Sequence, residues 1–488
     1  MLFSVLKRFF TTPVYGRPVQ KFYLEVYGCQ MNVNDGELVA GILSKNGQYE
    51  QVKSPMEANI ALLMTCSIRE SAEEKIWNRL EVLASMQKKE NRQLSVIGVL
   101  GCMAERLKLK VFERKQYINV VCGPDSYRHL PLLLESAFKG EKAVDVDLSM
   151  HETYEEELID SVRNPLSKSA FVSIMRGCNN MCTFCIVPFT RGRERSRSPE
   201  SIEKEIQVLS EKGIKEVTLL GQNVNSYNYV DDKEQLKEEP IEYSEGFRPL
   251  FKPRYHGVRF TNLLDSLSAK YPAIRFRFTS PHPREFPEDL LYLVNSRPNI
   301  ARHIHLPLQS GSSAVLERMR RGYTREAYLD LVSKIRSIIP GVGLSTDVMA
   351  GFCGETEEDH LQTIDVFEMV GFDMAYMYAY SMREKTAAYR RYDDDVPDEV
   401  KHRRLSEIIE VFKKQSANRL DTYVGTKTVV MIEGDSKRSA LHLSGRSSEN
   451  NVVVIPKPPE PLVFNVGDFV KARIISRKGS TLLGEALI

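Results

Sequence analysis

Three cysteines, Cys178, Cys182 and Cys185, follow one another at the spacing C-x3-C-x2-C, directly after an apolar run that is typical of a β-strand. Three thiolates in such a loop can bind three irons of a [4Fe-4S] cubane. The fourth iron then has no protein ligand, and it can chelate the amino and carboxylate groups of S-adenosylmethionine (SAM) and pass an electron to its sulfonium. A zinc site is the alternative, but structural zinc takes four ligands from paired Cys or Cys/His units. His256 and His282 are isolated in the sequence, so we interpret them as surface or core residues.

A second set of cysteines, Cys29, Cys66 and Cys102, is spread widely along the chain. Each follows an apolar run that is typical of a strand, and these runs are residues 21–28, 58–65 and 94–101. The carboxyl ends of parallel strands meet at one edge of a sheet, so the three thiols are expected to be neighbours. Spacing alone leaves two interpretations open: ligands of a second cluster, or buried structural cysteines, because free cysteine is among the most buried residue types.

The remaining cysteines, Cys122 and Cys353, have no obvious partner and are predicted to be packing residues. Eight cysteines in 488 residues are too few for a disulfide framework. Clustered cysteines in such a chain favour metal binding or catalysis.

Helical patterns at 34–46 and 68–90 alternate with the amino-terminal strands. This alternation predicts a doubly wound parallel sheet in a domain of residues 21–140. An acidic, weakly patterned stretch at 141–165 is interpreted as a linker.

A second series of alternating strands and helices occupies residues 166–418. The predicted strands are 170–175, 215–220, 274–280, 302–308, 342–350 and 372–380. The predicted helices are 199–212, 261–270, 286–296, 312–339 and 356–370, with a long charged helix at about 397–418. Six such units indicate a partial (β/α)6 barrel with its active site at the carboxyl ends of the strands. A charged stretch at 228–261 is interpreted as an insertion.

Residues 419–488 read as strands alone, in the runs KTVVMIEG, LHLSGR, NVVVIP, DFVKARIIS and STLLGEAL. Five short strands with turns between them predict a small all-β barrel of the oligonucleotide-binding (OB) type.

The bulk composition excludes a membrane span and global disorder but indicates no partner. Hydrophobic residues make up 42% of the chain, Lys plus Arg total 67 against 65 acids, and no run approaches the length of a membrane helix. Any surface that binds nucleic acid must therefore be sought in a local group of basic residues rather than in the net charge. The run 191–197 holds four arginines beside the C-x3-C-x2-C loop, and we predict phosphate contacts there, with a solvated charged face as the alternative.

The amino-terminal segment is basic and contains no acid before Glu25. Its mixture of apolar, hydroxyl and basic residues is typical of an amphipathic mitochondrial presequence over residues 1–20, with a plain basic tail as the alternative.

Seven sequence motifs closely resemble the MiaB-type tRNA methylthiotransferases, which are radical SAM enzymes. The motifs are YGCQMN (27–32), TCSIRESAEEKI (65–76), GCMAER (101–106), RGCNNMCTFCIVPFTRGRERSR (176–197), LLGQNVNSY (219–227), LPLQSGS (306–312) and GFCGETEED (351–359). The resemblance runs from about Lys21 to the carboxyl end and is strongest to the eukaryotic mitochondrial branch. Two departures are Met64, where the family usually has Asn, and Cys353, where bacterial members usually have Pro.

The resemblance implies two [4Fe-4S] clusters and SAM, with the family's ligands falling on the two cysteine sets described above. The catalytic cluster would be held by Cys178, Cys182 and Cys185. It also implies a basic RNA-binding module (TRAM) in the carboxyl-terminal barrel. Further candidates for SAM contacts follow the barrel strands: Gln222, Asn223, Gln309, Ser310, Ser312 and Asp347. Ordinary turn chemistry is the alternative for these polar residues.

The reaction that the resemblance implies is methylthiolation of carbon 2 of N6-isopentenyladenosine at tRNA position 37. One SAM would methylate a sulfur of the second cluster, and another would be cleaved to the 5′-deoxyadenosyl radical that abstracts the hydrogen. The implied partners are the anticodon stem-loop of tRNA, an electron donor and iron–sulfur assembly proteins, and the implied location is the mitochondrial matrix, with a cytosolic form left open. Alternatives are a sister enzyme acting on threonylcarbamoyl-adenosine or a ribosomal protein, and a regulatory protein with a kinase-activator partner.

Overall fold

The structure is a computed structural model that describes residues 18–67, 70–88, 93–152, 154, 167–230 and 257–487. The chain divides into two compact units, one made mainly of Met1–Ser67 and Ser71–Asp147, the other mainly of Leu148–Ile159 and Arg163–Ile488. Most of the predicted presequence and insertion, and much of the predicted linker, lie outside the described residues.

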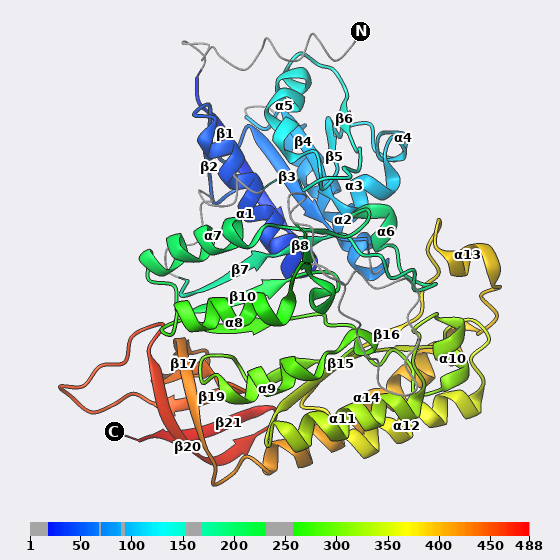
Figure 1. The fold of residues 1–488 in the computed structure, drawn as a ribbon. Helices are drawn as coiled ribbons and strands as arrows, with labels where there is room; N and C mark the ends of the chain where they lie inside the picture. The colour runs from blue at the N-terminus through cyan, green and yellow to red at the C-terminus, as the bar shows by residue number, and fades with distance from the viewer. Residues whose placement is uncertain are drawn as a thin grey trace. The chain divides into compact units, whose positions relative to one another are not determined.

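The first unit is built on a six-stranded sheet, and every strand in it is parallel to its neighbours (Figure 1). The strand order is β2-β1-β3-β4-β5-β6. The strands are β1 (Gln20–Val26), β2 (Tyr49–Gln51), β3 (Ile60–Thr65), β4 (Val96–Gly101), β5 (Val120–Cys122) and β6 (Ala143–Asp145). The predicted doubly wound sheet is thus present, although the three-residue strands were too short to show a pattern in the sequence. Strand β6 also lies inside the segment that we predicted as a linker.

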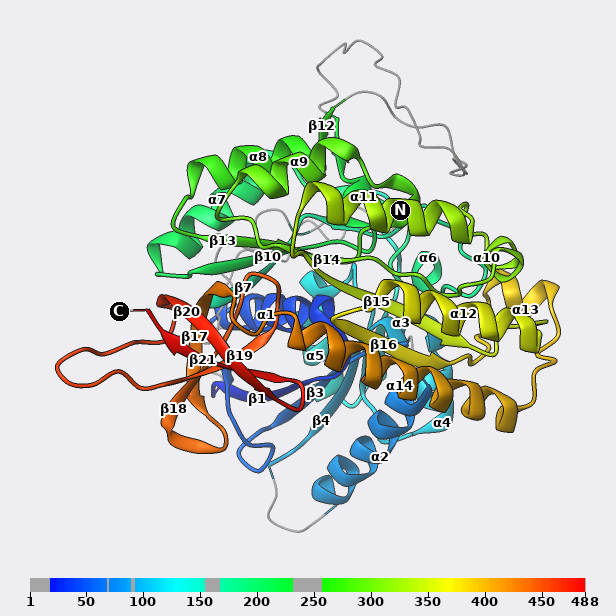
Figure 2. The same cartoon turned by 90° about the horizontal axis from the view of Figure 1, so that it is seen from below.

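Helices cover both faces of this sheet. They are α1 (Gln30–Lys45), α2 (Glu70–Gln87), α3 (Cys102–Leu107), α4 (Lys110–Arg114) and α5 (Leu130–Phe138). The apolar stripe of α2, with Ile76, Leu80 and Leu83 at helical spacing, packs against Leu63 and Val99 of the sheet. Figure 2 shows α1 and α5 on the opposite face from α2.

The second unit contains a six-stranded partial barrel. Its strands are β7 (Ser169–Ser173), β10 (Glu216–Leu220), β13 (Arg275–Phe278), β14 (His303–His305), β15 (Gly343–Ala350) and β16 (Met374–Ala379). They form two three-stranded parallel sheets in chain order, joined by a parallel bridge between Phe276 and Ile300. All six strands lie where the sequence predicted them, and their apolar side chains form the largest described core.

Helices alternate with these strands and surround the barrel (Figure 2). They are α6 (Val187–Thr190), α7 (Pro199–Glu211), α8 (Phe260–Lys270), α9 (Glu288–Ser296), α10 (Ser313–Arg318), α11 (Arg325–Ile338), α12 (Glu357–Val370), α13 (Ala387–Arg391) and α14 (Asp398–Asp421). Side-chain caps mark several starts, such as Thr356 and Asp359, which form a capping box on α12. The single helix predicted over 312–339 is two helices, because Arg320 and Gly322 take positive φ between α10 and α11.

The carboxyl-terminal strands form the closed five-stranded barrel that was predicted, in the order β17-β18-β19-β21-β20. They are β17 (Lys427–Ser436), β18 (Ser439–Arg446), β19 (Val452–Pro456), β20 (Phe469–Lys478) and β21 (Thr481–Ala486). Alternating side chains, among them Val430, Val453 and Ile474, fill its small core.

The turn between β18 and β19, residues 447–451, closes the amino-terminal end of the partial barrel, and we call it the closing loop. Arg277 donates hydrogen bonds to the carbonyls of Ser447 (2.7 Å) and Ser448 (3.1 Å). At Gly343, the first residue of β15, a Cβ atom would lie 2.3 Å from the carbonyl oxygen of Glu449, so only glycine permits this approach. The small barrel is therefore part of the larger barrel's structure.

Among the described helices, none combines the length and apolar character that crossing a membrane requires.

Candidate functional site

The C-x3-C-x2-C loop leaves the first barrel strand through a short antiparallel pair, β8 (Met175–Arg176) and β9 (Arg195–Ser196). Gly177 turns the chain with a φ of +76°, and a Cβ at this position would lie 2.0 Å from the carbonyl oxygen of Arg193. Only glycine fits there. The cysteine loop is therefore held at the carboxyl end of β7, where barrels of this kind bind their ligands.

The thiols of this loop face one another closely enough to interact electrostatically. Cys178 and Cys182 are buried and Cys185 is half-buried. Burial, and then the neighbouring Cys185 and Cys182, raise the pKa of Cys178 well above its usual value. Burial and then Cys182 raise the pKa of Cys185 to about 12. Three thiolates gathered here would repel one another unless cations bound them, so the donor set suits a metal cluster.

The spacing of the sulfur atoms disfavours the zinc alternative. Among the described residues, the one group of three or more possible ligand atoms that all lie within 4.8 Å of one another belongs to Glu357, His360 and Glu407. The three cysteine sulfurs are not such a group, so at least two of them lie more than 4.8 Å apart in this structure, whereas thiolates on one tetrahedral zinc, with Zn–S bonds of about 2.3 Å, lie closer together.

A buried arginine that the sequence analysis did not single out contacts this loop. Arg321, in the turn between α10 and α11, donates from Nη1 to Cys182 Sγ at 3.4 Å. Its position is fixed by Tyr323 Oη (3.1 Å) and by the carbonyl of Pro307 (3.2 Å). Hydrogen bonds to cluster sulfurs are among the features that set a cluster's reduction potential.

Beside the cysteine loop lie buried polar atoms with no hydrogen-bond partner among the described residues. They are Asn180 Nδ2, Gln222 Oε1, His282 Nε2, and Nε and Nη1 of Arg284. The other Arg284 nitrogen, Nη2, donates to Asn180 Oδ1, and the backbone N–H of Arg284 donates to His282 Nδ1. Buried polar groups are normally paired, so these atoms mark positions where polar atoms of a ligand belong.

The charges of this group suit an anionic portion of a ligand. Burial, followed by Arg321 and Arg284, lowers the pKa of His282 well below its ordinary value, so the imidazole is neutral at pH 7. Nε and Nη1 of Arg284 have no partner among the described residues, and each can donate a hydrogen bond to an oxygen of an anionic group, whereas Nη2 also contacts the Glu285 carboxylate. Sequence spacing gave no indication of Arg284, and His282 had been interpreted as an isolated histidine.

The other predicted SAM contacts are engaged with the protein itself. Asn223 donates from Nδ2 to Glu285 Oε2 at 2.6 Å. Ser310 is buried and accepts the backbone N–H of Ser312 at 3.2 Å. Asp347 lies 3.2 Å from His305 Nε2. Gln309 takes a φ of +68° in the bridge to β15. Their role toward SAM stays a prediction, and of this set Gln222 carries the unpartnered atom.

In the first unit, the widely separated cysteines are brought to one sheet edge. Cys66 follows β3 directly and Cys102 follows β4 directly, and the last residues of these strands are register partners. Cys29 precedes α1 as its N-cap. The residue before it, Gly28, is so close to Cys66 that a Cβ would lie 2.7 Å from the cysteine's own Cβ. The predicted gathering of the three positions at adjacent strands is thus present.

The cysteines predicted to be packing residues are both buried. Cys122 ends β5, and burial followed by Asp145 and Glu105 raises its pKa well above the usual value. Cys353 lies in a small apolar cluster with Phe352 and Tyr380.

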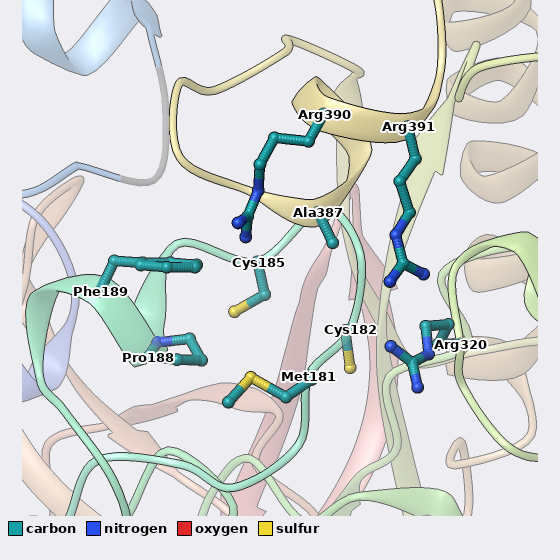
Figure 3. A pocket seen from close by; sticks show the side chains of 9 residues that line it. All are labelled: Met181, Cys182, Cys185, Pro188, Phe189, Arg320, Ala387, Arg390 and Arg391. Carbon is teal, nitrogen blue, oxygen red and sulfur yellow. The ribbon is translucent and has the colours of Figure 1, made fainter.

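A pocket of about 150 Å³ opens at the outer side of the cysteine loop. Figure 3 shows Arg390 and Arg391 descending from α13 toward Cys185 and Arg320. Met181, Cys182, Pro188, Phe189 and Ala387 complete the wall.

The prediction that residues 191–197 contact phosphates is wrong for three of its four arginines, because Arg191, Arg195 and Arg197 are buried. Arg195 is buried and donates to the carbonyls of Ser149 (3.0 Å) and Arg191 (3.0 Å). Arg197 is fully buried and forms an ion pair with Glu205 at 2.8 Å. These guanidinium groups hold the strand that frames the cysteine loop, whereas Arg193 is exposed.

Comparisons with known proteins agree with this architecture. Three family profiles match: the Radical SAM superfamily at residues 172–367, the uncharacterized protein family UPF0004 at 21–123, and the TRAM domain at 421–487. The solved structure of TsrM, a radical S-adenosylmethionine methyltransferase from Kitasatospora setae, superimposes with a TM-score of 0.51 at 12% identity, covering 74% of this chain and 72% of that one. These matches confirm the predicted fold class.

Curated relatives match along nearly the whole chain. The mitochondrial tRNA methylthiotransferase CDK5RAP1 of Rattus norvegicus is 50% identical, over 96% of this chain and 81% of the relative. The tRNA-2-methylthio-N(6)-dimethylallyladenosine synthase of Chloroherpeton thalassium is 47% identical, over 96% of each chain. With the radical SAM barrel, the UPF0004 sheet and the TRAM barrel all in place, this chain belongs to the radical SAM tRNA methylthiotransferase family that includes CDK5RAP1.

Proposed function

We propose that this protein is a tRNA methylthiotransferase that converts N6-isopentenyladenosine at position 37 to its 2-methylthio derivative. The observation that carries the proposal is the cysteine loop at the carboxyl end of β7, bordered by buried polar atoms that have no hydrogen-bond partner among the described residues. Carbon 2 of adenine bears an unactivated hydrogen that side-chain acids and bases cannot remove, so the hard chemistry must come from a cofactor.

Cys178, Cys182 and Cys185 would hold a [4Fe-4S] cluster, which family membership implies together with SAM. When bound, the cluster supplies an electron that cleaves SAM to methionine and a 5′-deoxyadenosyl radical. An unpartnered Arg284 nitrogen would donate to the SAM carboxylate, and Gln222 Oε1 would accept a hydrogen bond from a donor group of the cofactor. Arg321 would keep the Cys182 thiolate oriented and partly neutralised.

A second [4Fe-4S] cluster on Cys29, Cys66 and Cys102 belongs to the same proposal. Its support is the register of β3 and β4, which places Cys66 and Cys102 side by side, and the contact of Gly28 with Cys66. Two of the three thiols are buried. Binding of a cluster would explain why three cysteines gather at one sheet edge, whereas packing alone would not require cysteine at all three positions.

We infer the substrate and the cellular location from the names of the relatives. The relatives are named for dimethylallyladenosine in bacteria and for mitochondrial tRNA in mammals. We therefore extend the proposal to isopentenylated mitochondrial tRNA and to action in mitochondria. An electron donor and iron–sulfur assembly proteins are the further partners that this chemistry requires.

The test is direct. Protein reconstituted anaerobically with iron and sulfide is incubated with SAM, a chemical reductant and an anticodon stem-loop RNA carrying isopentenyladenosine. The expected product is RNA in which mass spectrometry finds a methylthio group on that nucleoside. Reconstituted protein that binds iron and cleaves SAM but leaves this nucleoside unchanged, while modifying threonylcarbamoyl-adenosine, would assign the chain to the sister reaction instead.

A further inference from the structure

Three arginines border the pocket beside the cysteine loop: Arg320, Arg390 and Arg391. All three are exposed. Within the described part of the chain none of them has a carboxylate partner, whereas Arg325 and Arg403 on neighbouring helices are both ion-paired. Arg390 donates only to carbonyls of its own segment and lies 5.8 Å from the ring centroid of Phe189. Three cations converge here without an anion from the protein.

The three arginines lie at the end of the barrel that carries the cysteine loop. The cysteine loop follows β7, Arg320 lies after β14, and α13 follows β16, so the pocket is bordered by loops from three strands. All three loops belong to the carboxyl end of the barrel, which is the end that binds substrate in such folds. The backbone joins them, since Thr183 donates to the carbonyl of Met319 and accepts from the N–H of Ala388.

The volume and the lining residues of the pocket limit the kind of ligand that it can bind. At about 150 Å³ it is smaller than the roughly 300–1,000 Å³ of small-molecule sites, and its wall includes Cys182 and Cys185, which would hold the cluster. The arginine rim is therefore the part of the pocket that suits a group of a polymer whose remainder lies outside. Its wall contains the Phe189 ring and the half-exposed Met181, on which a base can stack. The rim holds arginines and no lysine, and arginine is the residue whose planar fork matches phosphate.

We propose that Arg320, Arg390 and Arg391 bind phosphodiester groups of single-stranded RNA next to the nucleotide under modification. The proposal rests on the proposed function and deepens it by assigning a substrate-binding surface to the turn after α10 and to α13. The arginine run at 191–197 does not supply that surface, because two of its members are buried in ion-pair and carbonyl contacts.

The experiment compares two double variants of the full-length, cluster-loaded protein. Arg390→Ala/Arg391→Ala removes two rim charges. Lys204→Ala/Lys212→Ala removes two exposed charges from α7 and its C-cap, and the last turn of this helix lies at the amino-terminal end of the barrel strands. Binding of the isopentenylated anticodon stem-loop is measured by fluorescence anisotropy over a series of salt concentrations, and deoxyadenosine formation without RNA reports the state of the cluster.

The expected result follows from counterion release. Each phosphate contact to a single strand contributes about 0.7 to the slope of log K against log[salt], so the rim variant should lose about 1.4 from the slope. At about 0.1 M salt this corresponds to roughly 25-fold weaker binding, and the difference should vanish toward 1 M. The α7 variant should bind as the wild type does, and both should still cleave SAM. Arg390→Lys/Arg391→Lys should keep the slope but recover only part of the affinity.

Equal affinity and slope in the rim and α7 variants would overturn the proposal. So would a rim variant that binds RNA normally but is reduced slowly by a protein electron donor, since the rim would then be a docking site for an acidic donor. If the wild type itself neither binds the RNA nor modifies it, the proposed function fails, and that outcome is distinct from failure of the rim alone.

Discussion

Glu216 offers the sharpest test of the connection between the two barrels of the second unit. This residue begins β10, is buried, and accepts hydrogen bonds from Arg275 Nε (2.6 Å) and Arg277 Nε (2.7 Å). The two guanidinium groups in turn donate to the carbonyls of Arg446, Ser447 and Ser448. Replacing Glu216 with Gln would leave two buried cations around a neutral amide.

The expected destabilisation is large. Removing one partner from a buried ion pair costs about 3–5 kcal/mol, because the remaining charge stays buried without compensation. At about 2 °C per kcal/mol for a unit of this size, the midpoint of thermal unfolding should fall by about 6–10 °C. Although burial raises the pKa of Glu216, attraction by Arg277 and Arg275 outweighs it and leaves this pKa below its usual value. Burial lowers the pKa of Arg275 to about 10, so this guanidinium and the Glu216 carboxylate are both charged at pH 7.

The pH dependence has a defined sign. Because the folded-state pKa of Glu216 is lowered, the carboxylate stabilises the fold fully above the unfolded value of 4.5 and loses this effect as the pH falls below it. The midpoint difference between wild type and Glu216→Gln should therefore be constant from about pH 8 to 6 and shrink below pH 4.5.

Differential scanning fluorimetry measures these midpoints, with Glu211→Gln on the exposed end of α7 as the control, for which no shift is expected. A midpoint for Glu216→Gln within 1–2 °C of the control would refute the reasoning.

Three further predictions concern the cofactors. Cys182→Ala should lower bound iron by about four atoms per chain and abolish deoxyadenosine formation, as measured by iron analysis and chromatography. Cys66→Ala should lower iron by a similar amount but leave RNA-independent deoxyadenosine formation intact, because only the second cluster would lose a ligand. Arg284→Ala should raise the Kd for SAM about tenfold or more in equilibrium dialysis, and Arg284→Lys should restore part of the affinity, because one charge-assisted hydrogen bond to the carboxylate is worth about 1.5–3 kcal/mol.

Cys353→Ala is the matched control for both cysteine variants, because its thiol is buried in an apolar cluster. Equal loss of iron in Cys353→Ala and Cys182→Ala would contradict the ligand assignment, and an unchanged Kd in Arg284→Ala would remove that residue from the SAM site.

Local sequence pattern was enough to predict most of the fold. Apolar runs located all six strands of the partial barrel and all five of the terminal barrel, because each strand overlaps such a run. The three-residue strands β2, β5 and β6 were missed because they depend on pairing with β1, β4 and β5 respectively rather than on their own pattern. The break at Arg320 and Gly322 was missed because positive φ at a non-glycine residue leaves no periodic signal.

The candidate site was predictable where it is contiguous in the sequence. The spacing of Cys178, Cys182 and Cys185 was enough to predict that they bind a cluster. Arg284 and Arg321 lie more than a hundred residues further on, and only the closing of the barrel brings them to the cysteine loop. The phosphate contacts predicted for Arg195 and Arg197 were wrong because a run of charged residues in a sequence suggests an exposed surface. In the structure, these two side chains make hydrogen bonds within the protein instead.

The closing loop also constrains the order in which this chain can mature. The residues that seal the start of β10, β13 and β15 lie beyond position 446, and the strand that pairs with β19 and β20 does not end until Ala486. The chain is synthesised from its amino terminus. The strands of the partial barrel can therefore fold while the amino-terminal end of the barrel is still exposed to water. Arg275 and Arg277 acquire their acceptors at Arg446 and Ser447 only after a further 171 and 170 residues have been synthesised, so the partial barrel can reach its final form only once the small barrel has been made.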